Sequence, residues 1–140
     1  MLGIFLYLII PIFSTYSLNR DTLEIKDEQS ITSTSVSEFI DKAKKCIITT
    51  TGELTIGLTA FLGFSDLAEL TITAGTVSLV QQCFQQVSIG AVKIKATSGT
   101  VIFGDNSFVE SQIGSLEVDS VNTITVVSQS FKLCKNMKTL

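Results

Sequence analysis

Apolar and polar positions repeat four times along this chain in one ten-residue pattern. Each copy starts with Gly or Asn, continues with two apolar residues separated by one residue, and closes with a small residue followed by Phe. The closing residues are Phe61, Phe84, Phe108 and Phe131, which lie 23 or 24 positions apart. A fixed period of about 20–50 residues is typical of a solenoid, in which each repeat forms one coil that stacks on the next. The period therefore predicts a binding surface or scaffold rather than a catalytic pocket.

A second apolar pattern follows the Phe of each repeat. Its complete copies are Leu67-x-x-Leu70-x-Ile72, Ile89-x-x-Val92-x-Ile94 and Ile113-x-x-Leu116-x-Val118. Alternation of apolar residues with spacers is the pattern of a strand with one buried face. Strands this short are stable only when they stack on their equivalents, so we expect short parallel strands in about four coils of 23–24 residues. The expected buried ladders are Leu70–Val92–Leu116, Ile72–Ile94–Val118 and the four Phe residues.

The residues that open the ten-residue copies suggest how the chain turns. They are Gly52, Gly75, Gly99 and Asn122. Gly, and after it Asn, adopts positive φ most readily, so their alignment predicts a sharp left-handed turn before each second strand. The alternative is an ordinary turn without positive φ. The small residues before each Phe are Ala60, Cys83, Ser107 and Ser130, and they predict close packing beside the aromatic ladder.

The N-terminus divides the chain into three predicted parts. Its first thirteen residues are apolar, and small residues follow at Thr15 and Ser17. This arrangement predicts a secretory signal peptide over 1–17; the alternatives are an uncleaved membrane anchor, for which the run is short against about 20 residues, and a buried segment. Residues 18–34 are polar without a clear period, which predicts a linker. Residues 35–140 are predicted to form the solenoid, with an incomplete last repeat.

A short helix is predicted at the start of the solenoid. Val36, Phe39, Ile40 and Ala43 fall at the i, i+3, i+4, i+7 spacing of an amphipathic helix. Such a helix would cover the open end of the coil stack. Phe39 also lies 22 residues before Phe61, so the alternative is that it begins an irregular first repeat, and the two interpretations are partly compatible.

Composition limits the function classes that fit this chain. Its 140 residues are 45% hydrophobic and 16% charged, which suits one folded domain. A net charge of −3 gives no reason to expect a nucleic-acid partner. Because there is no His, the commonest general base and transition-metal ligand are missing, and Ser-His-Asp or Cys-His sites cannot form within the chain. We therefore expect no enzymatic activity, no cofactor and no metal.

The three cysteines, Cys46, Cys83 and Cys134, cannot all pair within one chain. Cys46 and Cys83 fall at positions predicted to be buried, where Cys usually acts as a small hydrophobe. In the predicted register Cys83 and Cys134 lie two coils apart, about 10 Å at the spacing of strands and beyond the roughly 7 Å that a disulfide spans. We expect three free thiols, although an oxidising compartment would favour a disulfide.

The spacers of the second pattern predict an exposed strand face. The candidate contact residues on it are Thr71, Lys93, Lys95, Glu117 and Asp119. Stacking places Lys93 beside Glu117 and Lys95 beside Asp119, and each opposite-charge pair supports the ladder by a fraction of a kcal/mol, about 0.2–1. One interpretation is that these charges serve only register and solubility. The other is that this face contacts a partner.

The repeats resemble the BspA-like, treponemal-type leucine-rich repeat, of the form A-F-x-x-C-x-x-L-x-x-I-x-I-P-x-x-V-x-x-I-G-x-x-A-F. The matching segments are Ile56-Gly57-x-x-Ala60-Phe61, Leu67-x-x-Leu70-x-Ile72 and Phe131-x-x-Cys134-x-x-Met137-x-x-Leu140. The chain departs from the form because the Pro is missing, the Cys position holds Phe64, Val87 and Ser111, and only the first repeat keeps I-G.

The resemblance implies a β-rich leucine-rich-repeat solenoid in a secreted or cell-surface protein that mediates protein binding or adhesion without catalysis. Its partner would be a protein or another cell-surface ligand, with membrane contact only through an uncleaved N-terminus. The alternative is a truncated structural array that lacks its own ligand or self-associates. Self-association would use the open edge of the strand at Leu116–Val118, because unpaired strand edges template further pairing.

Overall fold

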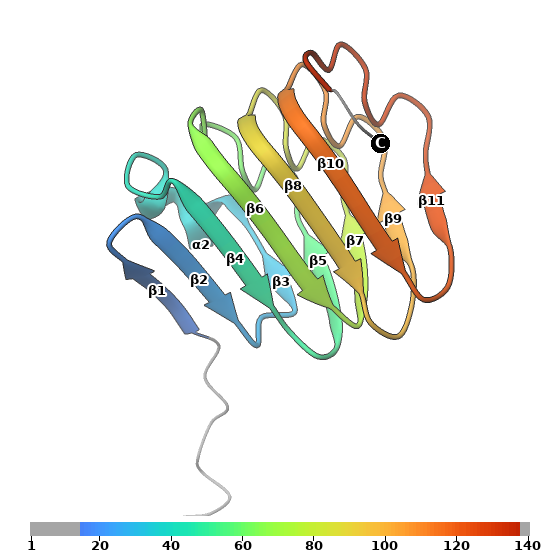
Figure 1. The fold of residues 1–140 in the computed structure, drawn as a ribbon, viewed down its shortest axis with the longest axis horizontal. Helices are drawn as coiled ribbons and strands as arrows, with labels where there is room; N and C mark the ends of the chain where they lie inside the picture. The colour runs from blue at the N-terminus through green and yellow to red at the C-terminus, as the bar shows by residue number, and fades with distance from the viewer. Residues whose placement is uncertain (1–14, 138–140) are drawn as a thin grey trace, which may run out of the picture.

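The chain folds as a β-solenoid of about five stacked turns and one short helix. The computed structural model describes residues 15–137. Figure 1 shows two rows of strands facing each other along the stack. The first sheet has the order β1-β2-β4-β6-β8-β10 and the second has the order β11-β9-β7-β5-β3. Since β2 to β11 supply one strand to each sheet per turn, the predicted solenoid is confirmed, with about five turns in place of four.

The first sheet contains the longer strands. They are β1 (Thr15–Asn19), β2 (Thr22–Lys26), β4 (Lys45–Thr49), β6 (Leu67–Ala74), β8 (Ser88–Ala96) and β10 (Gln112–Ser120). The second sheet consists of β3 (Ser30–Ile31), β5 (Glu53–Ile56), β7 (Thr76–Leu79), β9 (Val101–Phe103) and β11 (Ile124–Val126). All neighbouring strands run parallel except β1 and β2, which form an antiparallel hairpin.

The strand registers confirm the predicted ladders and extend them by two turns. The first ladder is Leu23, Cys46, Leu70, Val92 and Leu116, and the second is Ile25, Ile48, Ile72, Ile94 and Val118. All of these side chains are buried except Val118, which is partly exposed. The second sheet supplies the opposite wall, with Leu54, Val77 and Val101 in one ladder and Ile56, Leu79 and Phe103 in another.

Four Phe rings form one column inside the solenoid, as the period predicts. The ring centroids of Phe61 and Phe84 are 4.9 Å apart, those of Phe84 and Phe108 are 4.8 Å apart, and those of Phe108 and Phe131 are 5.3 Å apart. Neighbouring rings are inclined by only 10–24°. This spacing is close to the separation of paired strands, so the rings stack at the same rhythm as the backbone. The small residues before each Phe are all buried, which confirms the close packing predicted there.

Positive φ angles occur at other positions than the sequence predicts. Eight left-handed residues lie two positions before or two positions after a Phe of the column: Thr59, Gly63, Gln82, Gln86, Asn106, Glu110, Gln129 and Leu133. The other described residues with positive φ are Arg20, Asp27 and Asn136. The prediction of left-handed turns at Gly52, Gly75, Gly99 and Asn122 was wrong.

Close approach between turns explains two of those glycines instead. A Cβ at Gly75 would lie 2.6 Å from the Thr51 carbonyl oxygen, and one at Gly99 would collide with Thr76 Oγ1. These positions therefore favour Gly because successive turns leave no space for a side chain, whereas a Cβ at Gly52 would meet nothing within 4 Å.

The segment predicted as a linker, 18–34, instead carries strands of the solenoid. Strand β2 pairs in parallel with β4, and β3 pairs in parallel with β5. Leu23, Ile25 and Ile31 are completely buried. The alternation Leu23-x-Ile25 is a strand pattern of only two apolar residues, which the surrounding charged residues obscure. Of the predicted signal peptide, residues 1–14 lie outside the described residues, and Thr15–Ser17 belong to β1.

A short helix is present in the first turn, as α2 (Ser33–Val36) followed by a 3-10 segment (Ser37–Phe39), but it begins before the predicted residues and leaves Ile40 and Ala43 outside it. Thr32 and Ser35 form a capping box, in which each side chain accepts a hydrogen bond from the other residue's backbone N–H. Val36 and Phe39 are buried, and the Phe39 ring stacks on Tyr16 with centroids 6.5 Å apart. The helix lies between β3 and β4, where later turns carry a Phe of the column, so both interpretations of this segment hold in part.

Candidate functional site

The five candidate contact residues lie together on the outer face of the first sheet. Thr71 comes from β6, Lys93 and Lys95 from β8, and Glu117 and Asp119 from β10. The register aligns Thr71 with Lys93 and Glu117 in one row across the strands. A second row aligns Thr73 with Lys95 and Asp119. The predicted neighbours Lys93–Glu117 and Lys95–Asp119 are thus confirmed as register partners, and we call these two rows the strand face.

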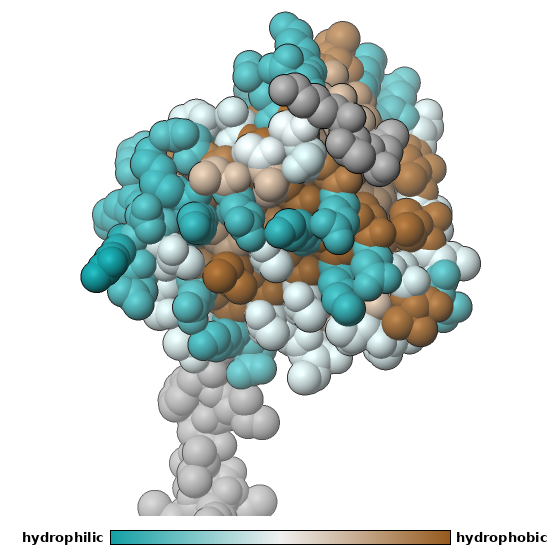
Figure 2. All heavy atoms as spheres, viewed as in Figure 1, coloured by the Kyte–Doolittle hydropathy of each residue, from teal (hydrophilic) through white to brown (hydrophobic). Residues whose placement is uncertain are grey.

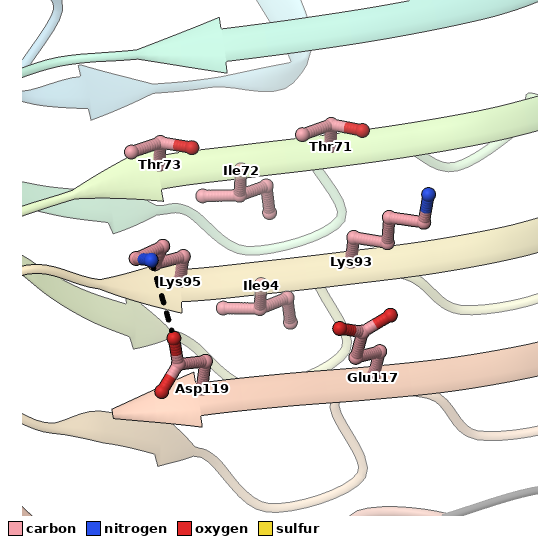
Figure 3. A pocket seen from close by; sticks show the side chains of 8 residues that line it. All are labelled: Thr71, Ile72, Thr73, Lys93, Ile94, Lys95, Glu117 and Asp119. Carbon is pink, nitrogen blue, oxygen red and sulfur yellow. Dashed lines mark ion pairs between the residues drawn. The ribbon is translucent and has the colours of Figure 1, made fainter. Parts of the chain in front are cut away.

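The strand face borders a shallow hollow with a volume of about 220 Å³. Its lining comprises the five candidate residues together with Ile72, Thr73 and Ile94. Figure 3 shows the polar side chains rising from three neighbouring strands around this hollow. Because its walls are exposed side chains on a flat sheet, the hollow offers a surface for contact rather than an enclosed chamber.

The charges of the strand face are only partly neutralised. Lys95 Nζ lies 3.3 Å from Asp119 Oδ2, and both side chains are exposed, so this ion pair adds little stability. Lys93 and Glu117 form no ion pair within the described residues, and the Lys93 side chain extends toward Thr71 in Figure 3. The face therefore presents one ammonium group and one carboxylate that are in no ion pair with a described residue.

The same outer face continues over β4 and β2. Ile47 and then Glu24 continue the row of Thr71, and Thr49 and then Lys26 continue the row of Thr73, so each row gains two positions. Ile47 is an exposed large apolar residue within a row of polar ones. Sequence analysis missed this extension, although the pattern Cys46-x-Ile48 marks the same strand and makes Ile47 and Thr49 its outward residues.

The acidic side chains and the thiols are the described candidates for metal binding or nucleophilic chemistry. Among residues 15–137, no three His, Cys, Asp or Glu side chains group in a way that would hold a metal ion. Burial raises the pKa of the Cys46 thiol to about 12, and the pKa of Cys83 is raised further by the same cause. Both thiols stay protonated at neutral pH and are poor nucleophiles. Cys134 is partly exposed, with its Sγ 3.5 Å from Ser111 Oγ, and all three cysteines are unpaired.

Comparison with known proteins finds no relative of this chain. No family model, no curated protein and no solved structure matches this chain. In the described part of the chain, no helix has the length and apolar character needed to cross a bilayer. Functional interpretation therefore depends on the solenoid and on the strand face.

Proposed function

We propose that this chain is a non-catalytic binding protein whose strand face contacts another protein or a cell-surface ligand. The observation that carries the proposal is the register of β6, β8 and β10, which sets threonines and charges of both signs in two straight rows. Parallel strands hold neighbouring residues within each row about 4.8 Å apart. A rigid array of this kind loses little conformational entropy when it binds, since its backbone is already ordered.

Charges of both signs favour a protein partner over a nucleic acid. A phosphate backbone selects clustered Lys and Arg, whereas Lys93 and Lys95 stand directly beside Glu117 and Asp119. Charges of both signs beside an exposed apolar residue, here Ile47, can be matched by complementary charges on a protein partner. The partner surface that fits is one with complementary charges of both signs and a small apolar area.

We also propose that the chain is secreted or displayed on the cell surface, and that it is a member of the BspA-like leucine-rich repeats. The period of 23–24 residues and the matching segments support the family. The apolar N-terminal run supports export. Cys46 and Cys83 are buried with raised pKa values, so these two thiols would persist in an oxidising compartment without pairing. Production of the full chain with a C-terminal epitope tag, followed by N-terminal sequencing of the exported product, tests this part; an intact Met1 on a retained product would contradict it.

A charge-reversal experiment tests the strand face. The full chain and its K93E/K95E variant are measured by biolayer interferometry against a panel of immobilised extracellular-matrix and plasma proteins. We expect one or more panel members to bind the full chain, and the double variant to bind at least about tenfold more weakly. Glu53→Lys is the matched control, because Glu53 is exposed on the second sheet. Equal losses in both variants, or no binding by the full chain, would contradict the proposal.

Self-association of the repeat array is a second candidate function. It is favoured by the large apolar side chains that the last turn exposes, among them Ile124 and Val126.

A further inference from the structure

The pattern that predicts cleavage of the N-terminal segment lies inside a folded strand. Thr15 and Ser17 are the small residues that place the predicted cleavage between Ser17 and Leu18. In the structure this peptide bond belongs to β1 (Thr15–Asn19). Cleavage there would remove three of the five residues that β1 pairs with β2. The predicted processing and the described strand therefore exclude each other.

The alternation of β1 gives the small residues a structural explanation. Thr15, Ser17 and Asn19 are exposed, whereas Tyr16 and Leu18 are partly buried and pack against the core. Successive side chains of a strand point to opposite faces, so the outward face of a strand presents small polar residues two positions apart. The spacing of Thr15 and Ser17 therefore follows from the strand and needs no peptidase to account for it.

The inward face of β1 covers an aromatic residue of the first turn. The Tyr16 and Phe39 rings are parallel to within 3°, with their centroids 6.5 Å apart. Phe39 is only 8% exposed, and burial raises the pKa of the Tyr16 hydroxyl above its usual value. A chain that began at Leu18 would lose the Tyr16 ring and expose part of Phe39 to water, which is unfavourable for an apolar side chain.

The backbone of β1 covers the outer edge of the first sheet. Strand β1 is the edge strand next to β2, and the turn between them is fixed, since the backbone N–H groups of Lys44 and Lys45 donate to the Asp21 carbonyl at 2.7 and 3.1 Å. Figure 2 shows mainly hydrophilic residues on the side of the molecule where β1 lies. Removal of residues 15–17 would leave β2 unpaired along Glu24–Lys26, and such an edge is a template for aggregation.

We propose that the Ser17–Leu18 bond survives export and that β1 is part of the mature protein, where it closes the first end of the solenoid. The inference rests on the proposed export and adds the position of the mature N-terminus, which is Thr15 or an earlier residue. It corrects the boundary that small residues alone predict, because the same residues form the outward face of a strand.

Mass spectrometry of the N-terminus tests this position. The full chain and its Ser17→Tyr variant, each with a C-terminal epitope tag, are produced in a secreting host. Tyrosine is too large for the residue before a signal-peptidase cut, whereas the exposed face of β1 accommodates it. We expect both chains to be exported equally and to begin at the same residue, no later than Thr15. An exported parent chain that begins after Thr15, or a change of N-terminus in the variant, would overturn the inference and leave the proposed export intact.

A stability comparison tests the role of β1 independently of export. Tyr16→Ala and Ser17→Ala are made in the full chain, and each protein is purified from the fraction in which it accumulates. Ser17→Ala is the matched control, because it keeps a small residue before the bond and changes only an exposed side chain. We expect Tyr16→Ala to lower the melting temperature by at least about 3 °C and Ser17→Ala to leave it unchanged. Equal melting temperatures of the parent and both variants would overturn the inference, since β1 would then contribute nothing to the mature fold.

Discussion

At the scale of the residue, the Phe column shows how the sequence determines the fold. Phe61, Phe84 and Phe108 are fully buried, and each ring packs on the next at 4.8–4.9 Å. The position before each Phe has a small side chain that is also buried, because the adjacent turns leave no room for a larger one. A ring inside such a column is packed on both of its faces. Its truncation therefore removes the contacts to both neighbouring rings and leaves a cavity that the stack cannot close.

Phe84→Ala should therefore lower the free energy of unfolding by about 3–5 kcal/mol. Urea titration followed by circular dichroism measures this loss. Phe131→Ala is the matched control, because Phe131 ends the column and is partly exposed, and it should cost distinctly less. Equal costs for the two substitutions would show that the column does not contribute through burial.

The burial of two cysteines also follows from single positions in the repeat. The burial of Cys46 and Cys83 was predictable from their places in the repeat, since Cys46 occupies a ladder position and Cys83 precedes a Phe of the column.

The sequence does not indicate which residues beside each Phe adopt positive φ. Those positions hold Thr, Gln, Asn, Glu and Leu as well as Gly. Because the left-handed conformation is unfavourable for residues with a Cβ, the geometry of the corner, and not the residue type, imposes positive φ there.

At the scale of the element, contact between successive turns decides which residues fit at the corners. Gly75 approaches the backbone of the preceding turn so closely that a Cβ would lie 2.6 Å from Thr51 O and 2.9 Å from Gly52 O. Gly52 opens the equivalent pattern one turn earlier, yet a Cβ there has free space. The two glycines share a place in the repeat but not an environment, because only Gly75 is packed against a preceding corner.

Gly75→Ala should lower the free energy of unfolding by about 1–3 kcal/mol, as expected for overpacking. Gly52→Ala should be neutral or stabilise by up to about 1 kcal/mol, because it only reduces the freedom of the unfolded chain. Thermal and urea unfolding of both variants gives the comparison. A similar effect at both positions would mean that backbone conformation, and not packing, selects Gly at this corner.

The strands of the later turns were predictable because apolar residues alternate there in repeated copies, and this also located the strand face. Three features escaped. Strand β2 shows only one alternation, Leu23-x-Ile25, among charged residues, and β3 has two residues. Strand β1 is antiparallel and follows no repeat. The outward position of Ile47 was missed because the segment Cys46-x-Ile48 is not one of the three complete copies of the second pattern.

At the scale of the whole molecule, the two ends of the solenoid differ. The first turn is closed by a hairpin and a helix, and the last described turn exposes its apolar interior. Period alone predicts the stacking but not this asymmetry, since the closing elements at the first turn do not follow the repeat.

The proposed contact through the strand face requires successive turns to stack in register. The most direct test is a solution NMR experiment on the chain with selectively labelled Phe, which measures nuclear Overhauser effects between rings. We expect Phe84 to show strong cross-peaks to both Phe61 and Phe108, whose ring centroids lie 4.9 and 4.8 Å from its own. If the Phe84 ring contacts neither of them, the turns are not stacked as described, and the strand face loses its basis.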